Sequence, residues 1–510
     1  MSQPGSRRVF VISDLHVGGV YAPTPEGRGF RMNTHIAELA KFVTGLAPSA
    51  SESRVELVIN GDMVDFLTER DNANAEWVPF TADPAAACAR LRTIADRDSV
   101  FFEALHTFLE GGNRLVILTG NHDLELTLPA VRRMLREVIG VRPGHDYEFI
   151  GNGEAYAIGN ALIEHGNRYD QWNMVNYDAL RHTGSLQSRR LPEDKYRFDP
   201  PPGSKMVSWV INPIKEDYKF VDLLKPETDV MVPLLLALEP GYRRILATVA
   251  LLARRAEEQA LVSPAMPGVA GDIGSQGQAA GTYIGDISSF ASDRGGPGTA
   301  ATPSGGEGEE ALRQLLDENL NGQGAAFLDH LPAAGAAVTT ADISSFGDAV
   351  NRSIGLARLL LSHDDADVGR RLPALLQALR AVHEVKCFDL DNETVPVYVN
   401  AAKDLFLGGF RYVIFGHTHM AKQAELEPGC WYFNSGTWAD LMQMPPGILN
   451  PVSDADARQE LEAFLLGISS GPLAPWILYR PTYVELEVDA NENVVNVQLC
   501  TVTLPATAAS

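Results

Sequence analysis

Five short segments of the sequence carry side chains that could bind metal ions. They supply seven oxygen or nitrogen ligands, which are Asp14, His16, Asp62, Asn121, His165, His417 and His419. Carboxylate, amide and imidazole ligands without a thiolate suit manganese, iron, zinc and similar divalent ions. The sequence therefore predicts a centre that holds two divalent metal ions.

Three acidic or basic side chains in these segments have a more specific predicted role. Asp62 has two carboxylate oxygens, so one side chain could bridge two cations. His122 could donate a proton or a hydrogen bond to a phosphoryl oxygen or to a leaving group. Asp65 is expected to hold a ligand or cap a turn rather than to bind metal itself.

Two pairs of candidate ligands are spaced two residues apart, Asp14 with His16 and His417 with His419. In an extended loop, side chains at positions i and i+2 point the same way. We therefore expect Asp14 and His16 to bind one ion together, and His417 and His419 to share the same i, i+2 geometry.

Each segment follows a short apolar run that is rich in β-branched residues. These runs cover residues 9–13, 57–60, 115–119, 161–164 and 412–415, with helical patterns over 34–44 and 100–110. The alternation predicts an α/β core, and open α/β sheets bind ligands at the carboxyl ends of their strands. A further alternating run over 483–504 predicts a hairpin around residues 491–493.

The middle of the chain differs, because residues 169–385 hold few strand patterns and several helical ones, at 243–259, 309–319 and 372–384. Residues 263–308 are dominated by Gly, Ala, Ser and Pro, which is typical of flexible loops. We expect a core in two parts, 1–168 and 396–510, interrupted by a mostly helical insertion at 169–395. The insertion is expected to form a cap over the metal site, or alternatively a module for homo-oligomer formation.

Composition limits the partners. The chain has 42 basic and 65 acidic residues and a formal net charge of -23, which disfavours non-specific binding to nucleic acid. Bound divalent ions can still attract a phosphorylated substrate. The four cysteines are far apart, which favours a reducing cytoplasm over a disulfide framework. Glu239, Arg243 and Arg244 interrupt the most apolar stretch, so no transmembrane segment is expected.

The ordered motifs DLH, GDMVD, GNHD, EHGN and GHTH resemble the signature of the calcineurin-like metallophosphoesterase superfamily. The resemblance covers residues 9–170 and 396–440 and implies a β-sandwich flanked by helices. It implies one ion held by Asp14, His16, Asp62 and His419, and another held by Asp62, Asn121, His165 and His417. It also implies that His122 assists at the leaving group.

The activity that follows is hydrolysis of a phosphate monoester or diester. Two divalent ions, manganese first and iron, zinc, nickel or cobalt as alternatives, would lower the pKa of a shared water. The resulting bridging hydroxide would attack phosphorus in line. The alternatives are a nuclease of the same superfamily and a non-catalytic metal-binding scaffold protein.

Residues next to the motifs bear on the substrate. The DLH and GDMVDFL segments are similar to those of UDP-2,3-diacylglucosamine pyrophosphohydrolases, although His122 and the long insertion depart from that branch. The protein serine/threonine phosphatases resemble GDxVDRG at the second motif, and here Phe66 replaces the Arg. We expect a phosphorylated small molecule or a lipid-linked substrate. Arg168 and Asn33 are candidate substrate-binding residues, with Trp172 as a stacking surface, unless the Arg pairs with an acidic neighbour.

Overall fold

The computed structural model describes residues 6–19, 29–48, 54–70, 75–191, 195–196, 198–225, 233–235, 237–238, 359, 368–380, 388–449, 453–470 and 474–502. The chain divides into two compact units. The first comprises residues 1–231, 252–265 and 382–510, and the second comprises 232–251 and 266–381. All seven candidate metal ligands belong to the first unit.

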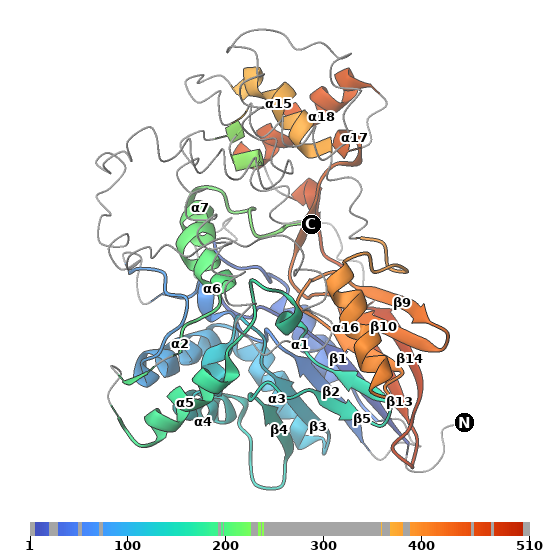
Figure 1. Ribbon diagram of the computed structural model, residues 1–510. Coiled ribbons are helices and arrows are strands. Elements are labelled where there is room, and N and C mark those ends of the chain that lie inside the picture. Colours follow the sequence, from blue (N-terminus) through green and yellow to red (C-terminus); the bar gives the residue numbers. More distant parts are fainter. Residues whose placement is uncertain are drawn as a thin grey trace, which may run out of the picture. The chain divides into compact units, whose positions relative to one another are not determined.

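A six-stranded sheet with the order β14-β13-β1-β2-β3-β4 forms the first layer of this unit (Figure 1). The strands are β1 (Arg7–Ile12), β2 (Val55–Asn60), β3 (Arg114–Leu118), β4 (Asp146–Ile150), β13 (Thr482–Val488) and β14 (Val494–Thr501). Strands β1 to β4 are parallel, whereas β13 pairs antiparallel with β1 and with β14. The chain's first strand is therefore completed by its last hairpin.

A five-stranded sheet with the order β5-β6-β8-β10-β9 forms the second layer. Its strands are β5 (Tyr156–Ile158), β6 (Ala161–Ile163), β8 (Tyr412–Phe415), β9 (Lys422–Glu427) and β10 (Cys430–Asn434). Alternate residues of the first sheet, such as Val9 and Val58, pack against Ile163, Ile414 and Phe433 of the second. The two sheets thus form a β-sandwich, which confirms the expected fold class.

The opposite side chains of the first sheet pack against helices. Phe10, Ile12 and Leu57 point into a cluster with residues of α1, α2, α3 and α4. These helices are α1 (Ile36–Gly45), α2 (Pro84–Arg97), α3 (Ser99–Glu110) and α4 (Pro129–Ile139). The side chain of Asp83 caps α2 by accepting a hydrogen bond from the N–H of Ala86. Helix α16 (Pro396–Leu407) contacts β8, β9 and β10 of the second sheet.

A small third sheet with the order β12-β11-β7 joins two distant parts of the chain. Its strands are β7 (Leu224–Lys225), β11 (Leu441–Gln443) and β12 (Ile477–Leu478). The remaining α-helices of the described residues are α5 (Tyr177–Ser188), α6 (Pro202–Met206), α7 (Asn212–Asp217), α15 (Val368–Arg380), α17 (Pro446–Leu449) and α18 (Asp454–Ser470). Short 3-10 or π turns occur at η1 (Phe66–Thr68), η2 (Leu124–Thr127), η3 (Asn167–Tyr169), η5 (Val207–Ile211) and η8 (Ala474–Trp476).

The five expected strands, the two expected helices and the C-terminal hairpin are all present. The ranges 243–259, 263–308 and 309–319 lie outside the described residues, and the helix expected at 372–384 corresponds to α15. The three-part domain division stays a prediction. Within the described part of the chain, no helix is both long and apolar enough to cross a membrane.

Glu125 gives the folded chain a predictable response to pH. It is buried in η2 and accepts a hydrogen bond from the N–H of Thr81 at 2.7 Å. Burial raises its pKa from 4.5 to about 7. As pH rises between these values the unfolded chain loses this proton first, so folding stability falls by about 1.4 kcal/mol for each unit of pKa difference.

We therefore expect Glu125→Gln to flatten the decline of stability between pH 5 and 7. Urea midpoints measured at pH 5, 6 and 7 test this, with Glu103→Gln on the exposed face of α3 as the matched control. Parallel pH curves for wild type and Glu125→Gln would contradict the expectation.

Candidate metal centre

The loops that carry the five motifs meet at the carboxyl ends of β1, β2, β3, β6 and β8. The first two loops are joined through their backbones. The N–H groups of Leu15 and His16 both donate to the carbonyl oxygen of Asp62, at 2.9 and 3.0 Å, and Asp14 N–H donates to Gly61 at 3.2 Å. The candidate ligands of these loops are therefore held by main-chain contacts rather than by side-chain packing alone.

Most of the candidate ligands have an unusual backbone conformation. Asp14, His16, Asp62, His417 and His419 have φ angles of 54°, 44°, 50°, 69° and 62°. Non-glycine residues with positive φ cost of order 1–3 kcal/mol each and cluster at functional sites. The expectation of extended loops was wrong here, because both members of each i, i+2 pair are left-handed.

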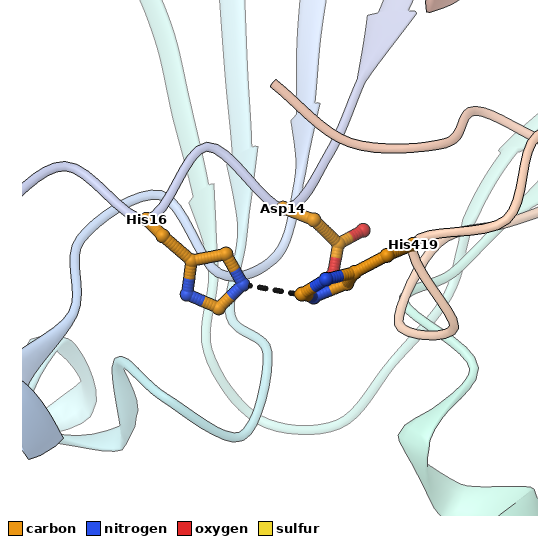
Figure 2. A group of neighbouring side chains, drawn as sticks. All are labelled: Asp14, His16 and His419. Carbon is orange, nitrogen blue, oxygen red and sulfur yellow. Dashed lines mark hydrogen bonds and ion pairs between the residues drawn. The ribbon is translucent and has the colours of Figure 1, made fainter. Parts of the chain in front are cut away.

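The first group of side chains nevertheless converges. Ligand atoms of Asp14, His16 and His419 lie within 4.8 Å of one another, and all three residues are buried (Figure 2). The Nε2 atoms of His16 and His419 are 3.0 Å apart, and His419 Nε2 is 3.4 Å from Asp14 Oδ1. Asp14 Oδ1 and His419 Nδ1 are buried without a hydrogen-bond partner. Two facing imidazole nitrogens beside a carboxylate are a suitable set of donors for a divalent cation.

The second group is formed by Asp14, Asp62 and His165, whose ligand atoms also lie within 4.8 Å of one another. The Nδ1 atom of His165 donates to the carbonyl oxygen of Asn60 at 2.8 Å, which leaves the lone pair on Nε2. This Nε2 lies 3.3 Å from Asp62 Oδ2. Neither His165 Nε2 nor the buried Oδ1 of Asn121 has a hydrogen-bond partner. Both atoms are thus available for an ion.

Asp62 lies between the two groups, as a bridging carboxylate should. Its Oδ2 is 3.3 Å from His165 and 3.9 Å from His16, while its Oδ1 accepts the backbone N–H of His122 at 2.8 Å. A Cβ at Gly120 would approach Asp62 Oδ1 to 2.1 Å. The glycine of the third motif is therefore required for close packing around this carboxylate.

The charges of the cluster are mutually stabilising. Burial favours the neutral acids, but nearby histidines outweigh it and lower the pKa of Asp14 to about 2 and that of Asp62 well below its usual value. Burial disfavours the charged form of His165, but Asp62 and Asp14 outweigh it and raise its pKa to about 10, so a cation that binds Nε2 must displace a proton from it. The carboxylates remain ionised, which is the state that binds a cation.

The carboxylate of Asp65 lies close to the Nδ1 atoms of two histidines. Its Oδ1 lies 3.2 Å from Nδ1 of His122, and its Oδ2 lies 3.4 Å from Nδ1 of His16. It also caps η1 by accepting the N–H of Leu67 at 3.1 Å. The structure therefore places Asp65 in both of the supporting roles that the sequence predicted.

His417 lies at the edge of the cluster. The centroids of the His417 and His165 rings are 5.4 Å apart, and His417 Nε2 is 3.0 Å from Asp170 Oδ2. The same Asp170 oxygen accepts a hydrogen bond from Asn173 Nδ2 at 2.7 Å, and Asn173 Oδ1 accepts one from Asn121 Nδ2 at 3.2 Å. Asp170 and Asn173 thus orient two of the predicted ligands of the same ion, a role that sequence reasoning did not assign to them.

Removing Asn173 should weaken the binding of one of the two proposed ions and leave the binding of the other unchanged. In Asn173→Ala the amide of Asn121 loses its partner, and losses of supporting contacts of this kind cost about 10–100-fold in metal affinity. Competition against a metal-binding dye would show one weakened site of two. Asn152→Ala, in an exposed turn, is the control. Two undisturbed sites in Asn173→Ala would contradict the assignment.

A cavity of about 390 Å³ opens beside these residues. Its lining includes side chains of the cluster, namely Asp62, Asp65, Asn121, His122, His417 and His419. The rest of its described lining is Met32, Thr68, Asp170, Trp172, Asn173, Gly203, Met206, Val207, Ile211, Asn212, Asp222 and Lys225. A small-molecule substrate could therefore reach the candidate metal ligands and His122 together.

The two predicted substrate-binding residues are not among the described residues that line the cavity. The guanidinium of Arg168 pairs with Glu164 at 3.1 Å and also donates to the carbonyl oxygen of Gly153. Asn33 is fully buried, donates to the carbonyl oxygen of Leu15 at 2.9 Å and accepts the N–H of His35 at 2.8 Å. Their polar groups are used internally, so the structure does not support a substrate role for either.

Comparison with models of protein families finds a match. The model of the calcineurin-like phosphoesterase family matches residues 7–223, a range that contains the first four motifs. His417 and His419 lie beyond the matched range and reach the cluster through β8. A search of curated proteins found no match.

Proposed function

Residues 7–223 belong to the calcineurin-like phosphoesterase family, and from that premise we propose that the protein hydrolyses phosphate esters with two divalent metal ions. The observation that carries the proposal is the overlap of buried Asp and His groups around Asp62. Four of these residues, Asp14, His16, His165 and His419, carry a buried oxygen or nitrogen atom without a hydrogen-bond partner. Asp62, His122 and His419 also line a cavity large enough for a substrate.

The residues divide between the two ions as follows. Asp14, His16 and His419 would hold one, while Asn121, His165 and His417 would hold the other, with Asp62 shared. The bound ions supply an acidified water and neutralise charge on the phosphoryl oxygens. Manganese is our first choice, with iron, zinc, nickel or cobalt as alternatives for this mixed oxygen and nitrogen set.

His122 is proposed as the residue that assists the leaving group. It lines the cavity, its side chain retains 15% exposure, and Asp65 holds its Nδ1 at 3.2 Å. With Nδ1 engaged, Nε2 can donate a hydrogen bond or a proton to the departing oxygen. The carboxylate of Asp65 would stabilise the charged imidazolium that supplies this proton.

The proposal is tested by stripping the protein of metal and restoring each ion separately. We expect hydrolysis of p-nitrophenyl phosphate or bis-p-nitrophenyl phosphate to be absent without metal and to return with manganese. Metal content measured on the same samples should approach two ions per chain. Uptake without hydrolysis of either ester would favour the metal-binding scaffold, and no uptake of any ion would reject the site itself.

A further inference from the structure

The cavity has a second side that the metal-ligand candidates do not form. Apolar side chains of Met32, Trp172, Met206, Val207 and Ile211 line it. Met206 ends α6, and Val207–Ile211 form the π-helical turn η5 that follows. Such turns are frequent at functional sites. We call Trp172, Met206, Val207 and Ile211 the apolar wall.

Close packing fixes this wall relative to the metal centre. The N–H of Gly203 donates to the carbonyl oxygen of Trp172 at 2.6 Å, and a Cβ at Gly203 would meet Asn173 Oδ1 at 2.1 Å. Asn173 in turn contacts Asn121. Beyond the π-helical turn, Asn212 donates to the carbonyl oxygen of Leu67 at 2.7 Å. The wall is therefore anchored at both ends to loops that carry the site.

Lys225 is the one lysine or arginine among the described residues that line the cavity. The pairing of β7 with β11, with Lys225 opposite Gln443, brings it there. Lys225 is therefore the lysine or arginine of the described lining that is placed to meet a phosphate.

We propose that the cavity selects phosphate esters of a compact apolar or aromatic alcohol, with Lys225 on the phosphate oxygens and the apolar wall around the alcohol. This specificity rests on the phosphoesterase function proposed above. In the reaction, water forms the new P–O bond, the P–O bond to the alcohol breaks, and the alcohol oxygen leaves with a proton. A volume of about 390 Å³ suits a ring or a short chain.

Binding of two non-hydrolysable phosphonates to the manganese-loaded full chain tests the apolar wall. Calorimetry should show phenylphosphonate binding about tenfold or more tightly than methylphosphonate, because only the former buries a ring. Trp172→Ala should bring the two affinities close together, whereas Trp172→Phe should keep most of the preference. Equal affinities in wild type, no binding of either phosphonate, or an undiminished preference in Trp172→Ala would overturn the proposal.

The role of Lys225 is tested with the same pair of ligands. Lys225→Met should weaken both phosphonates by a similar factor, about tenfold or more, because both lose one charge-assisted hydrogen bond. Lys219→Met removes a lysine from the same segment that is not among the described cavity residues, and it should leave both affinities unchanged. Unaltered binding in Lys225→Met would refute the anion-binding role.

Failure of this inference can be told apart from failure of the proposed function. A protein that hydrolyses p-nitrophenyl phosphate with metal but binds both phosphonates equally would keep the function and lose the specificity. In the same protein, kcat/KM for 2-phenylethyl phosphate should exceed that for ethyl phosphate, since both leaving groups are simple alcohols, and the ratio should fall in Trp172→Ala.

Discussion

Asp62→Ala should lower kcat/KM by on the order of a thousandfold, because the two ions proposed to share this carboxylate would each contribute several kcal/mol to catalysis. Asp62 is in contact distance of His165 and accepts the backbone N–H of His122. Its loss therefore removes the link between the two groups of ligands. We expect metal content to fall from two ions toward one, measured by elemental analysis alongside hydrolysis of p-nitrophenyl phosphate.

A matched control is Asp178→Ala, which removes an aspartate whose side chain is 87% exposed. It should leave metal content and kcat/KM unchanged. Circular dichroism and thermal unfolding must show that Asp62→Ala is folded. A folded Asp62→Ala protein with wild-type turnover would overturn the assignment of the centre.

His122→Asn should slow the release of poor leaving groups far more than that of good ones. General acid catalysis contributes about 10²–10⁴-fold, but p-nitrophenol departs readily without a proton. We therefore expect a loss of at least about a hundredfold in kcat for an alkyl phosphate and a much smaller loss for p-nitrophenyl phosphate. The measured quantity is the ratio of kcat for the alkyl phosphate to kcat for p-nitrophenyl phosphate, compared between wild type and variant.

Metal analysis of the same variant separates two roles for His122. Its ligand atom lies within 4.8 Å of those of His16 and Asp62, so proximity alone is compatible with metal binding. A leaving-group role requires His122→Asn to retain both ions. Loss of an ion, with equal decreases for alkyl and aryl esters, would identify His122 as a ligand instead. Asp65→Asn should reproduce part of the leaving-group effect, because it alters the partner of His122 Nδ1.

The fold was predictable where a strand is buried on both faces. All residues of β2 are buried, and the apolar run 57–59 within it is visible in the sequence. By contrast, β4 is half-buried throughout and β9 alternates between buried and exposed residues around a bulged pairing. Such edge strands carry a weak pattern, so neither was expected. Helices α2 and α4 were also missed, although Pro84 and Pro129 mark their first turns.

The candidate ligand residues could be chosen from the sequence because their types and order resemble a known motif set, whereas their surroundings could not be predicted. Left-handed φ angles at Asp14 and His417 are invisible in sequence, since neither residue is a glycine. Arg168 was a reasonable phosphate ligand until the structure showed Glu164 beside it. Lys225 could not have been chosen, because only the pairing of β7 with β11 brings it to the cavity.

The pairing of the first strand with the last hairpin has a consequence for synthesis of the protein. Arg7 pairs with Glu492, 485 residues later, and β1 carries Asp14 at its end. At about 5–20 residues per second, a ribosome needs roughly 25–100 s to deliver that partner. Until then the emerging chain exposes an unpaired apolar strand edge, and for most of this interval it also lacks His417 and His419. Prematurely terminated products should therefore aggregate rather than hydrolyse substrate, and chaperone demand should be greatest before the final hairpin is released.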